Sequence, residues 1–315
     1  MLPDGRRVGA HLPLGMGMVR AADRAAEIGA DAIQVFTDNP TAWRRRAAPP
    51  RELPAFRRRL EILEIAPLAI HASYLVNLAG SEDDLVGRSV AVLASELRAA
   101  PGYLGRFVNV HVGSHRGAGV AAGTRRLAEG LALTLAEVDD GPGSAMIVLE
   151  NSPGSGFALG TSVAELADIL DAAAAGGVPA GRLGVCLDTA HAWAAGIDVS
   201  DPVAIDAVLR EFDARIGLER LVMLHLNDSK SELGSHIDRH EHLGAGRIGV
   251  RGLRHLLCHP SLARATYYLE TPGMDEGYDA VNIARAYDIA AGRPLADLPP
   301  EALEMAGSRS RAGAP

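Results

Sequence analysis

The sequence predicts an α/β protein that folds as a single closed (β/α)8 barrel, the TIM-barrel architecture. Eight short apolar runs recur along the 315 residues, and a segment with helical periodicity follows nearly every run. Such alternation of strands and helices is typical of a parallel sheet, because each helix returns the chain to the same edge. Eight units in roughly 270 residues match the size of a closed barrel, which is why we expect one domain rather than two.

The expected strands are short runs of mainly aliphatic residues, bounded by glycine, proline or polar turn formers. They cover residues 8–10, 32–36, 67–70, 106–110, 145–149, 183–187, 221–226 and 265–269. These runs lack the alternation of polar and apolar residues that a half-exposed strand shows. Both faces of each strand are therefore expected to be buried, as in a parallel barrel.

The expected helices are amphipathic segments with signals at their ends. Gly29 should end the first helix, Ser81 should cap the third with Asp83 and Asp84 in its first turn, and Thr161 should cap the fifth. The helices are expected within 18–29, 43–63, 81–99, 123–138, 161–175, 202–216, 250–258 and 282–291. The barrel domain would span residues 1–295. Residues 296–315 form a predicted C-terminal tail, whose last ten residues we expect to be disordered.

The composition limits the classes of function. Hydrophobic residues make up 48% and charged residues 22% of the chain, as in an ordinary globular protein. The net charge of −8 argues against a nucleic-acid binder, which is usually basic, although bound divalent ions would offset that charge in one cleft. The two cysteines suggest no disulfide framework, and no run predicts a signal peptide or a membrane span. We therefore expect a cytoplasmic protein without a membrane partner.

Six consecutive predicted strands, the third to the eighth, end or nearly end in a side chain that can bind a metal ion. These residues are His71, His111, Glu150, Asp188, His225 and Glu270. The chain has only 39 acidic residues and 11 histidines, too few for six such endings to be an expected coincidence. Because the carboxyl ends of barrel strands meet at one face, where active sites lie, these side chains predict a metal site there.

Three further candidates follow the sixth and seventh of the eight predicted strands. His191 lies three residues after Asp188, and Asp238 and His240 point the same way if their segment is extended. Nine ligands suit three ions if one carboxylate bridges two of them, and mixed histidine and carboxylate shells suit zinc, or manganese at some positions. Clustered divalent ions serve displacement at phosphorus. Taken alone, the segment 221–249 is equally compatible with a polar loop that carries solvated histidines.

The chain resembles the endonuclease IV family of apurinic/apyrimidinic endonucleases over about residues 8–290. The segments that carry the resemblance are VGAH (8–11), RAAEIGADAIQVFT (24–37), HASYLVNLAG (71–80), NVHVGSH (109–115), LENSPG (149–154), GVCLDTAHAWAAG (184–196), HLNDSKSELGSHIDRHEHLGAGRIG (225–249) and LETP (269–272). The resemblance implies a monomeric DNA-repair enzyme with three zinc ions. It would cut double-stranded DNA 5′ to an abasic site and leave 3′-hydroxyl and 5′-deoxyribose phosphate ends.

The resemblance also implies a role for each candidate. The first ion would take His71, His111 and Glu150; the second Glu150, Asp188, His225 and Glu270; and the third His191, Asp238 and His240. Glu150 would bridge two ions, and Glu270 would also orient or deprotonate the attacking water. Tyr74 and Leu75 would enter the DNA at the lesion, and Arg239 would contact a phosphate.

Some residues depart from the family, and two rival functions stay open. Thr41 stands where members usually carry an arginine, and the arginines at 44–46, which follow Trp43, are expected to contact DNA in its place. His11 is expected to be a hydrogen-bonding neighbour rather than a ligand. A sugar isomerase or epimerase of the xylose-isomerase type would use only Glu150, Asp188, His225 and Glu270. A non-catalytic DNA-damage binder would have lost ligands, and none is missing.

Overall fold

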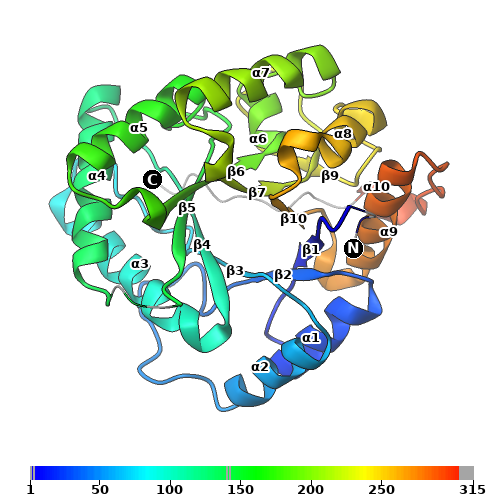
Figure 1. Cartoon of the computed structure of the whole chain (residues 1–315), viewed down its shortest axis with the longest axis horizontal. Helices are drawn as coiled ribbons and strands as arrows, with labels where there is room; N and C mark the ends of the chain where they lie inside the picture. The colour runs from blue at the N-terminus through cyan, green and yellow to red at the C-terminus, as the bar shows by residue number, and fades with distance from the viewer. Residues whose placement is uncertain (1, 3, 140, 142, 305–315) are drawn as a thin grey trace.

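A computed structural model of the chain describes residue 2, residues 4–139, residue 141 and residues 143–304. Eight parallel strands close into a barrel in the order β1-β10-β7-β6-β5-β4-β3-β2 (Figure 1). They are β1 (Val8–His11), β2 (Ala32–Val35), β3 (Leu68–His71), β4 (Gly105–His111), β5 (Met146–Glu150), β6 (Leu183–Asp188), β7 (Leu221–His225) and β10 (Thr266–Leu269). The predicted α/β barrel is confirmed, and all eight expected strands are present.

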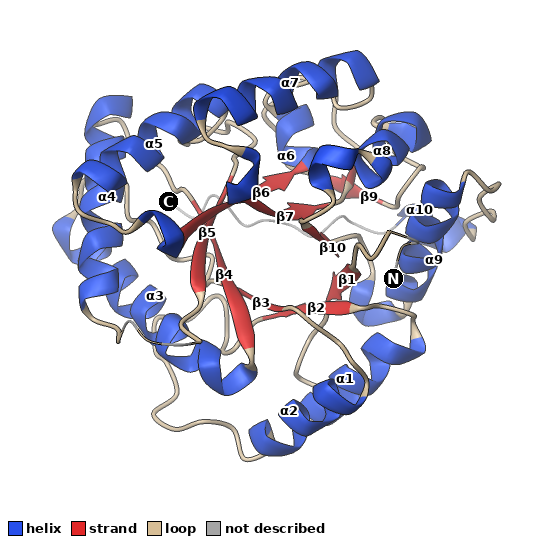
Figure 2. Ribbon diagram, viewed as in Figure 1, coloured by secondary structure: helices blue, strands red, loops and turns tan. Residues whose placement is uncertain are grey.

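Helices surround the barrel (Figure 2). They are α1 (Met18–Glu27), α2 (Leu53–Ile62), α3 (Asp83–Tyr103), α4 (Val120–Ala136), α5 (Val163–Ala175), α6 (Thr189–Ala194), α7 (Pro202–Arg215), α8 (Gly249–Cys258), α9 (Tyr278–Ala291) and α10 (Pro300–Glu304). The sequence did not predict α6, α10 or the short antiparallel pair β8 (Asp228–Ser229) and β9 (His240–Glu241). Two predicted caps are wrong: Glu82 precedes α3 without a side-chain cap, and Ser162 rather than Thr161 caps α5.

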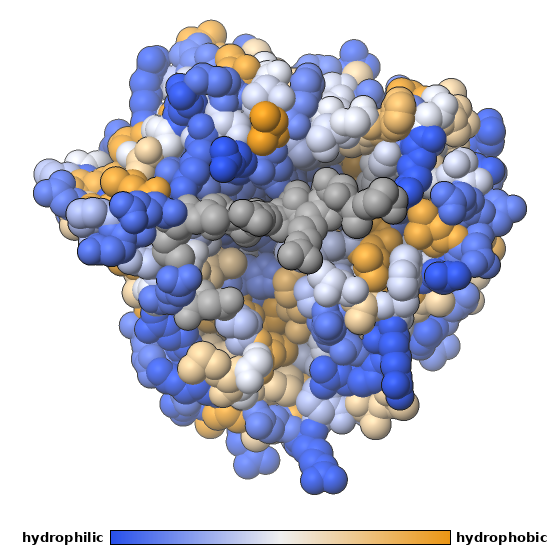
Figure 3. Space-filling view, turned by 180° about the vertical axis from the view of Figure 1, so that it is seen from behind, coloured by the Kyte–Doolittle hydropathy of each residue, from blue (hydrophilic) through white to orange (hydrophobic). Residues whose placement is uncertain are grey.

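Two layers of apolar side chains position the strand ends. Inward-facing residues fill the barrel itself: Ala32, Ala69, Phe107, Val148, Cys186, Met223 and Tyr268. A larger core packs the outer faces of the strands against the helices, so each strand is buried on both sides. The barrel is therefore a packed core rather than a pore, and polar chemistry is confined to its ends. The coloured part of the face shown in Figure 3 is mostly hydrophilic, with smaller hydrophobic areas.

Part of the predicted tail is attached to the barrel. The Ala302 carbonyl in α10 accepts a hydrogen bond from His242 Nε2 at 2.9 Å. The Ala296 carbonyl accepts one from Arg285 at 2.6 Å. Ala302 therefore contacts the loop that follows β7, and Ala296 contacts α9, to which Arg285 belongs. The disorder expected of the last ten residues concerns a segment outside the described residues. Among the helices described, none combines the length and the apolar character that crossing a membrane requires.

Candidate metal centre

The nine predicted ligands lie at the carboxyl end of the barrel. His71, His111, Glu150, Asp188 and His225 are the last residues of β3 to β7, and Glu270 follows β10 directly. The other three come from α6 and from the segment around β9. Eight of the nine fall into three groups whose ligand atoms lie within 4.8 Å of one another: His71, His111 and Glu150; Glu150, Asp188, His225 and Glu270; and Asp188, His191 and His240. Glu150 joins the first two groups, and Asp188 joins the last two.

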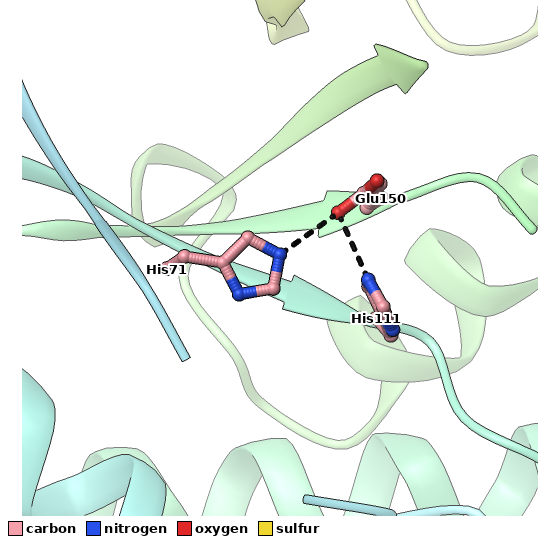
Figure 4. Close-up of side chains that lie close together, drawn as sticks. All are labelled: His71, His111 and Glu150. Atoms are coloured by element: carbon pink, nitrogen blue, oxygen red, sulfur yellow. Dashed lines mark ion pairs between the residues drawn. The ribbon is translucent and has the colours of Figure 1, made fainter. Parts of the chain in front are cut away.

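The first group is organised around one carboxylate oxygen. Glu150 Oε2 lies 3.4 Å from His111 Nε2 and 3.7 Å from His71 Nε2 (Figure 4). His71 Nδ1 donates a hydrogen bond to its neighbour's carbonyl, that of Ala72, at 2.7 Å. A ring whose Nδ1 carries the proton leaves the Nε2 lone pair free, so this bond presents the correct nitrogen to a metal ion.

The second group places His225 among three carboxylates. His225 Nδ1 lies 3.1 Å from Glu150 Oε1, 3.5 Å from Glu270 Oε2 and 3.8 Å from Asp188 Oδ2. Its other nitrogen, Nε2, donates to Gln34 Oε1 at 3.0 Å, which leaves Nδ1 for a metal ion. Gln34 also donates to Glu270 Oε1 at 2.5 Å. Gln34 therefore orients two candidate ligands at once.

The third group depends on the short helix α6. Asp188 caps this helix because its Oδ1 accepts the His191 N–H at 2.9 Å, which turns the chain and brings both side chains into the site. His191 Nε2 lies 3.4 Å from Asp238 Oδ2, and His240 Nε2 lies 3.1 Å from Asp238 Oδ1. Both rings donate Nδ1–H to backbone carbonyls, those of Asn151 at 2.9 Å and Glu270 at 2.7 Å, so both present Nε2.

In the metal-free site, the imidazoles lower the pKa of a carboxylate and the carboxylates raise the pKa of an imidazole. Burial alone would raise the pKa of Glu150, but the surrounding imidazoles, first those of His225 and His111, hold it well below its usual value. Burial disfavours the imidazolium of His240, yet the carboxylates of Asp238 and Asp188 raise the pKa of His240 to about 10. Protons therefore occupy the positions that cations would take.

The residues fit divalent metal ions. His240 Nε2 and Asp238 Oδ1 are buried and have no hydrogen-bond partner among the described residues, although they face each other. Orphaned buried polar atoms are rare, and a missing ion is one of the few explanations for them. The donor set consists of imidazole nitrogens and carboxylate oxygens without thiolates, which suits zinc or manganese.

This arrangement predicts how the stability of the metal-free protein depends on pH. Because His240 has a folded-state pKa of about 10 against an ordinary 6.5, the folded chain binds more protons than the unfolded chain between these values. The free energy of unfolding should therefore fall as the pH rises from 7 to 9.5. Urea unfolding of chelator-treated protein measures this. His240→Asn should reduce the slope, and a metal-free protein that becomes more stable across this range would contradict the assignment.

Asp228 holds the loop that carries the third group of ligands. Its buried Oδ1 accepts the N–H groups of Ser229 at 2.8 Å and Ile248 at 3.0 Å, and its Oδ2 accepts those of Gly244 at 2.9 Å and Gly246 at 3.1 Å. Burial raises the pKa of the Asp228 carboxyl, and these N–H donors oppose that shift. A Cβ at position 246 would overlap Asp228 Oδ1, which explains why the segment GAGRIG needs a glycine there.

We expect Asp228→Asn to destabilise the protein by about 2–5 kcal/mol, because the amide NH2 would leave two or more backbone N–H groups without an acceptor. Urea unfolding of the metal-loaded protein measures the change. Asp213→Asn is the matched control, since Asp213 accepts a single N–H, that of Leu218, at an exposed position. Equal stability of the two variants would show that Asp228 does not organise the loop.

The residues predicted to contact DNA lie around this site. Tyr74 is 47% exposed, and its ring lies 5.4 Å from that of His71. Leu75 is partly buried beside it, and Arg239 is exposed between two candidate ligands. Thr41 is exposed, but its side chain bonds Asn39 Oδ1 at 2.9 Å.

The expectation that all three arginines at 44–46 face DNA is wrong for Arg45. Its side chain is only 11% exposed, and it lies 3.8 Å from the buried carboxylate of Glu96 on α3. It also donates to the carbonyls of Asn39 and Ala42. The attraction of this buried acid turns Arg45 inward. Arg44 and Arg46 stay exposed.

Sequence reasoning missed the amides that orient the ligands. Gln34, Asn109 and Asn227 are fully buried. Asn109 donates to Glu150 Oε2 at 2.6 Å, and Asn227 donates to Asp188 Oδ2 at 2.8 Å. A polar residue within or just after an apolar strand run was the available signal, because a buried amide must have partners. His11 makes the hydrogen-bonding contact expected of it, to Glu270 Oε1 at 3.0 Å.

Comparison with known proteins agrees with this geometry. Residues 22–292 match a family described as the xylose isomerase-like TIM barrel. The fold and the site together therefore define a metal-binding barrel of the xylose isomerase-like class. Within that class, the chain belongs to the endonuclease IV family.

The relatives match over most of their length. A probable endonuclease 4 from Methanoculleus marisnigri is 40% identical over 90% of this chain and 98% of that protein. A probable endonuclease 4 from Halothermothrix orenii is 36% identical over 89% of this chain and 99% of that protein. The crystal structure of endonuclease IV from Thermus thermophilus covers 91% of this chain and 99% of its own, with a TM-score of 0.77 and 37% identity. The crystal structure of a D-tagatose 3-epimerase-like protein shares the fold alone. It covers 90% of this chain and 96% of its own, with a TM-score of 0.61 and 15% identity.

Proposed function

We propose that this protein is a DNA-repair endonuclease that cuts the phosphodiester backbone 5′ to abasic sites with three zinc ions. The observation that carries the proposal is the presence of three ligand groups joined by the carboxylates of Glu150 and Asp188. Ions held by these residues would supply positive charge to one phosphate and would favour deprotonation of a water molecule. The expected products carry 3′-hydroxyl and 5′-deoxyribose phosphate ends.

The side chains of the site have distinct tasks in this proposal. Glu150 is the shared carboxylate at the centre, so its position fixes the spacing of two ligand groups. Glu270 Oε1 is hydrogen-bonded by His11 and Gln34, whereas Oε2 lies 3.5 Å from His225 Nδ1, the nitrogen that His225 presents to a metal ion. Oε2 is therefore the atom that can bind an ion and accept a proton from water. The backbone carbonyls that hold three of the imidazoles keep their metal-binding nitrogens aimed at the cluster.

DNA recognition falls to residues at the rim. The exposed ring of Tyr74, with Leu75 beside it, is placed to fill the gap that a missing base leaves in the stack. Arg239 lies in the sequence between the candidate ligands Asp238 and His240, where its charge can meet the phosphate. The acidic chain as a whole carries −8, so its attraction for DNA must come from this face and its metal ions.

The test is incubation with a duplex that carries one tetrahydrofuran abasic analogue, with and without EDTA. We expect cleavage at the analogue, loss of cleavage with EDTA and recovery with added zinc. An undamaged duplex of the same sequence is the control. Failure to cut the analogue after zinc loading would overturn the proposal. Turnover of a free ketose under the same conditions would favour the isomerase or epimerase alternative, which leaves the first and third ligand groups unexplained.

Two arginines should account for part of the salt dependence of DNA binding. We expect the double variant Arg44→Ala, Arg46→Ala to flatten the slope of log K against log salt concentration by about 0.9 for each lost phosphate contact. Binding of an uncleaved abasic duplex across a salt series measures this. Arg58→Ala, which removes an exposed charge from α2, is the control. An unchanged slope in the double variant would remove this segment from the DNA path.

A further inference from the structure

A second cluster of metal-binding side chains lies away from the barrel mouth, between α7 and α8, which are neighbours in the ring of helices (Figure 1). Asp206 belongs to α7, His255 belongs to α8, and His259 is the C-terminal cap of α8. One ligand atom from each of these residues lies within 4.8 Å of the other two. We propose that these three residues form an additional zinc site that joins α7 to the end of α8.

The spacing within the cluster suits the ion. The two histidines are four residues apart, which places them on one side of a helix. Both Nε2 atoms face the same oxygen, Asp206 Oδ1, His255 at 2.6 Å and His259 at 3.3 Å. Zinc bonds of 2.0–2.2 Å at tetrahedral angles separate two ligand atoms by roughly 3.3 Å. His259 already has that separation, and His255 needs a small rotation of its partly exposed side chain.

The hydrogen bonds of His259 oppose the ion only weakly. His259 Nδ1 accepts the Ser261 N–H at 3.2 Å, so the neutral ring carries its proton on Nε2. This N–H points to Asp206 Oδ1. Zinc at Nε2 moves that proton to Nδ1 and breaks the bond to Ser261. One exposed neutral hydrogen bond changes an equilibrium by roughly tenfold or less. Three ligands on one divalent ion outweigh it.

The local charges also favour zinc. Burial and the neighbouring His255 lower the pKa of His259, so this ring is neutral at pH 7 and releases no proton from a charged form. The carboxylate of Asp206 is held ionised, because the hydrogen bond from His255 lowers its pKa. Arg6, a nearby cation, donates to the His259 carbonyl at 3.1 Å, and its charge is paired with Asp4. The partial exposure of all three side chains leaves a fourth position for water.

Such a site would brace the part of the barrel behind the metal centre. His259 leads through a short 3-10 helix, Pro260–Leu262, into β10, which is followed by Glu270. Helices α7 and α8 flank the chain that forms β7 and the loop with Asp238 and His240. Zinc bound at the cluster would therefore stabilise the outer helices while leaving the reacting groups untouched.

The test compares zinc stoichiometry in the full-length protein and in two variants, Asp206→Asn and His255→Ala. Each protein is stripped of metal, equilibrated in a buffer that fixes free Zn2+, and analysed for ions per chain. We expect each variant to bind one zinc fewer than the unmodified protein and to cut an abasic duplex at an unchanged rate. Glu211→Gln, an exposed carboxylate on α7 that is part of no ligand group, is the matched control and should bind as many ions as the unmodified protein.

A second readout uses stability. Excess zinc should raise the unfolding temperature of the unmodified protein and of Glu211→Gln more than that of either variant. Equal zinc counts in all four proteins, or equal zinc-dependent shifts, would overturn the proposal. The expected difference of one ion is independent of how many ions the barrel mouth binds, so this result is separate from that of the proposed nuclease function.

Discussion

His191→Ala should fold, bind one metal ion fewer and cut an abasic duplex about a thousandfold more slowly. The imidazole is only 5% exposed, and its Nε2 lies 3.4 Å from Asp238 Oδ2. Without it, only Asp238 and His240 serve the third ion alone, because Asp188 Oδ2 lies 3.8 Å from His225 Nδ1 of the second group and 3.7 Å from His240 Nε2. Two unshared ligands should hold zinc weakly. The third ion would supply charge stabilisation worth several kcal/mol, and each 1.36 kcal/mol is tenfold in rate. Elemental analysis and single-turnover cleavage measure the two effects.

The same variant separates the nuclease from a sugar isomerase. An isomerase that uses Glu150, Asp188, His225 and Glu270 has no need of His191, so its turnover would survive the substitution. His236→Ala is the control, because His236 lies in the loop that carries Asp238 but belongs to no ligand group. Full metal content together with unchanged cleavage in His191→Ala would contradict the three-ion assignment.

The candidate ligands on the strands could be predicted because the carboxyl ends of all the parallel strands of a barrel lie at one face. Each of His71, His111, Glu150, Asp188 and His225 is the last residue of its strand, so parallel pairing alone brings these residues to one face. The apolar runs locate the strands, since both faces of a barrel strand are buried. The positions of the strand ends therefore predict which candidate ligands lie close together at this face.

The remaining features depend on contacts that the local sequence does not encode. Helix α6 is only six residues long and exists because Asp188 caps it, which no hydrophobic period reveals. The inward turn of Arg45 requires Glu96, 51 positions away in the sequence, to be buried beneath it. The cap of α5 shifted by one residue because Ser162, and not Thr161, accepts the Glu165 N–H. Such side-chain choices follow from packing, and helix ends are uncertain by a residue or two.

Glu270→Gln should lower the rate of abasic-site cleavage by about 10³–10⁴-fold, because it combines the loss of a general base with the loss of a metal-binding oxygen. Gln34 donates to Glu270 Oε1 at 2.5 Å and His11 lies 3.0 Å from the same atom, so the amide oxygen of the variant stays there. The amide NH2 then replaces Oε2, faces His225 Nδ1, and can neither bind an ion nor accept a proton. Rate measurements at saturating DNA isolate the chemical step from binding.

The pH–rate profile tests which groups limit the activity at low pH. Neighbouring imidazoles, first that of His225, lower the pKa of Glu270 against the opposing influence of burial, so the carboxylate is ionised throughout the working range. The unmodified enzyme should therefore lose activity at low pH through its histidine ligands rather than through Glu270. Glu241→Gln, which changes a carboxylate paired with Lys230 outside the ligand groups, should keep near-normal cleavage. If Glu270→Gln retained normal metal content and a rate within tenfold of the unmodified enzyme, Glu270 would be neither ligand nor base, and the water would have to be oriented by Glu150 or Asp188 instead.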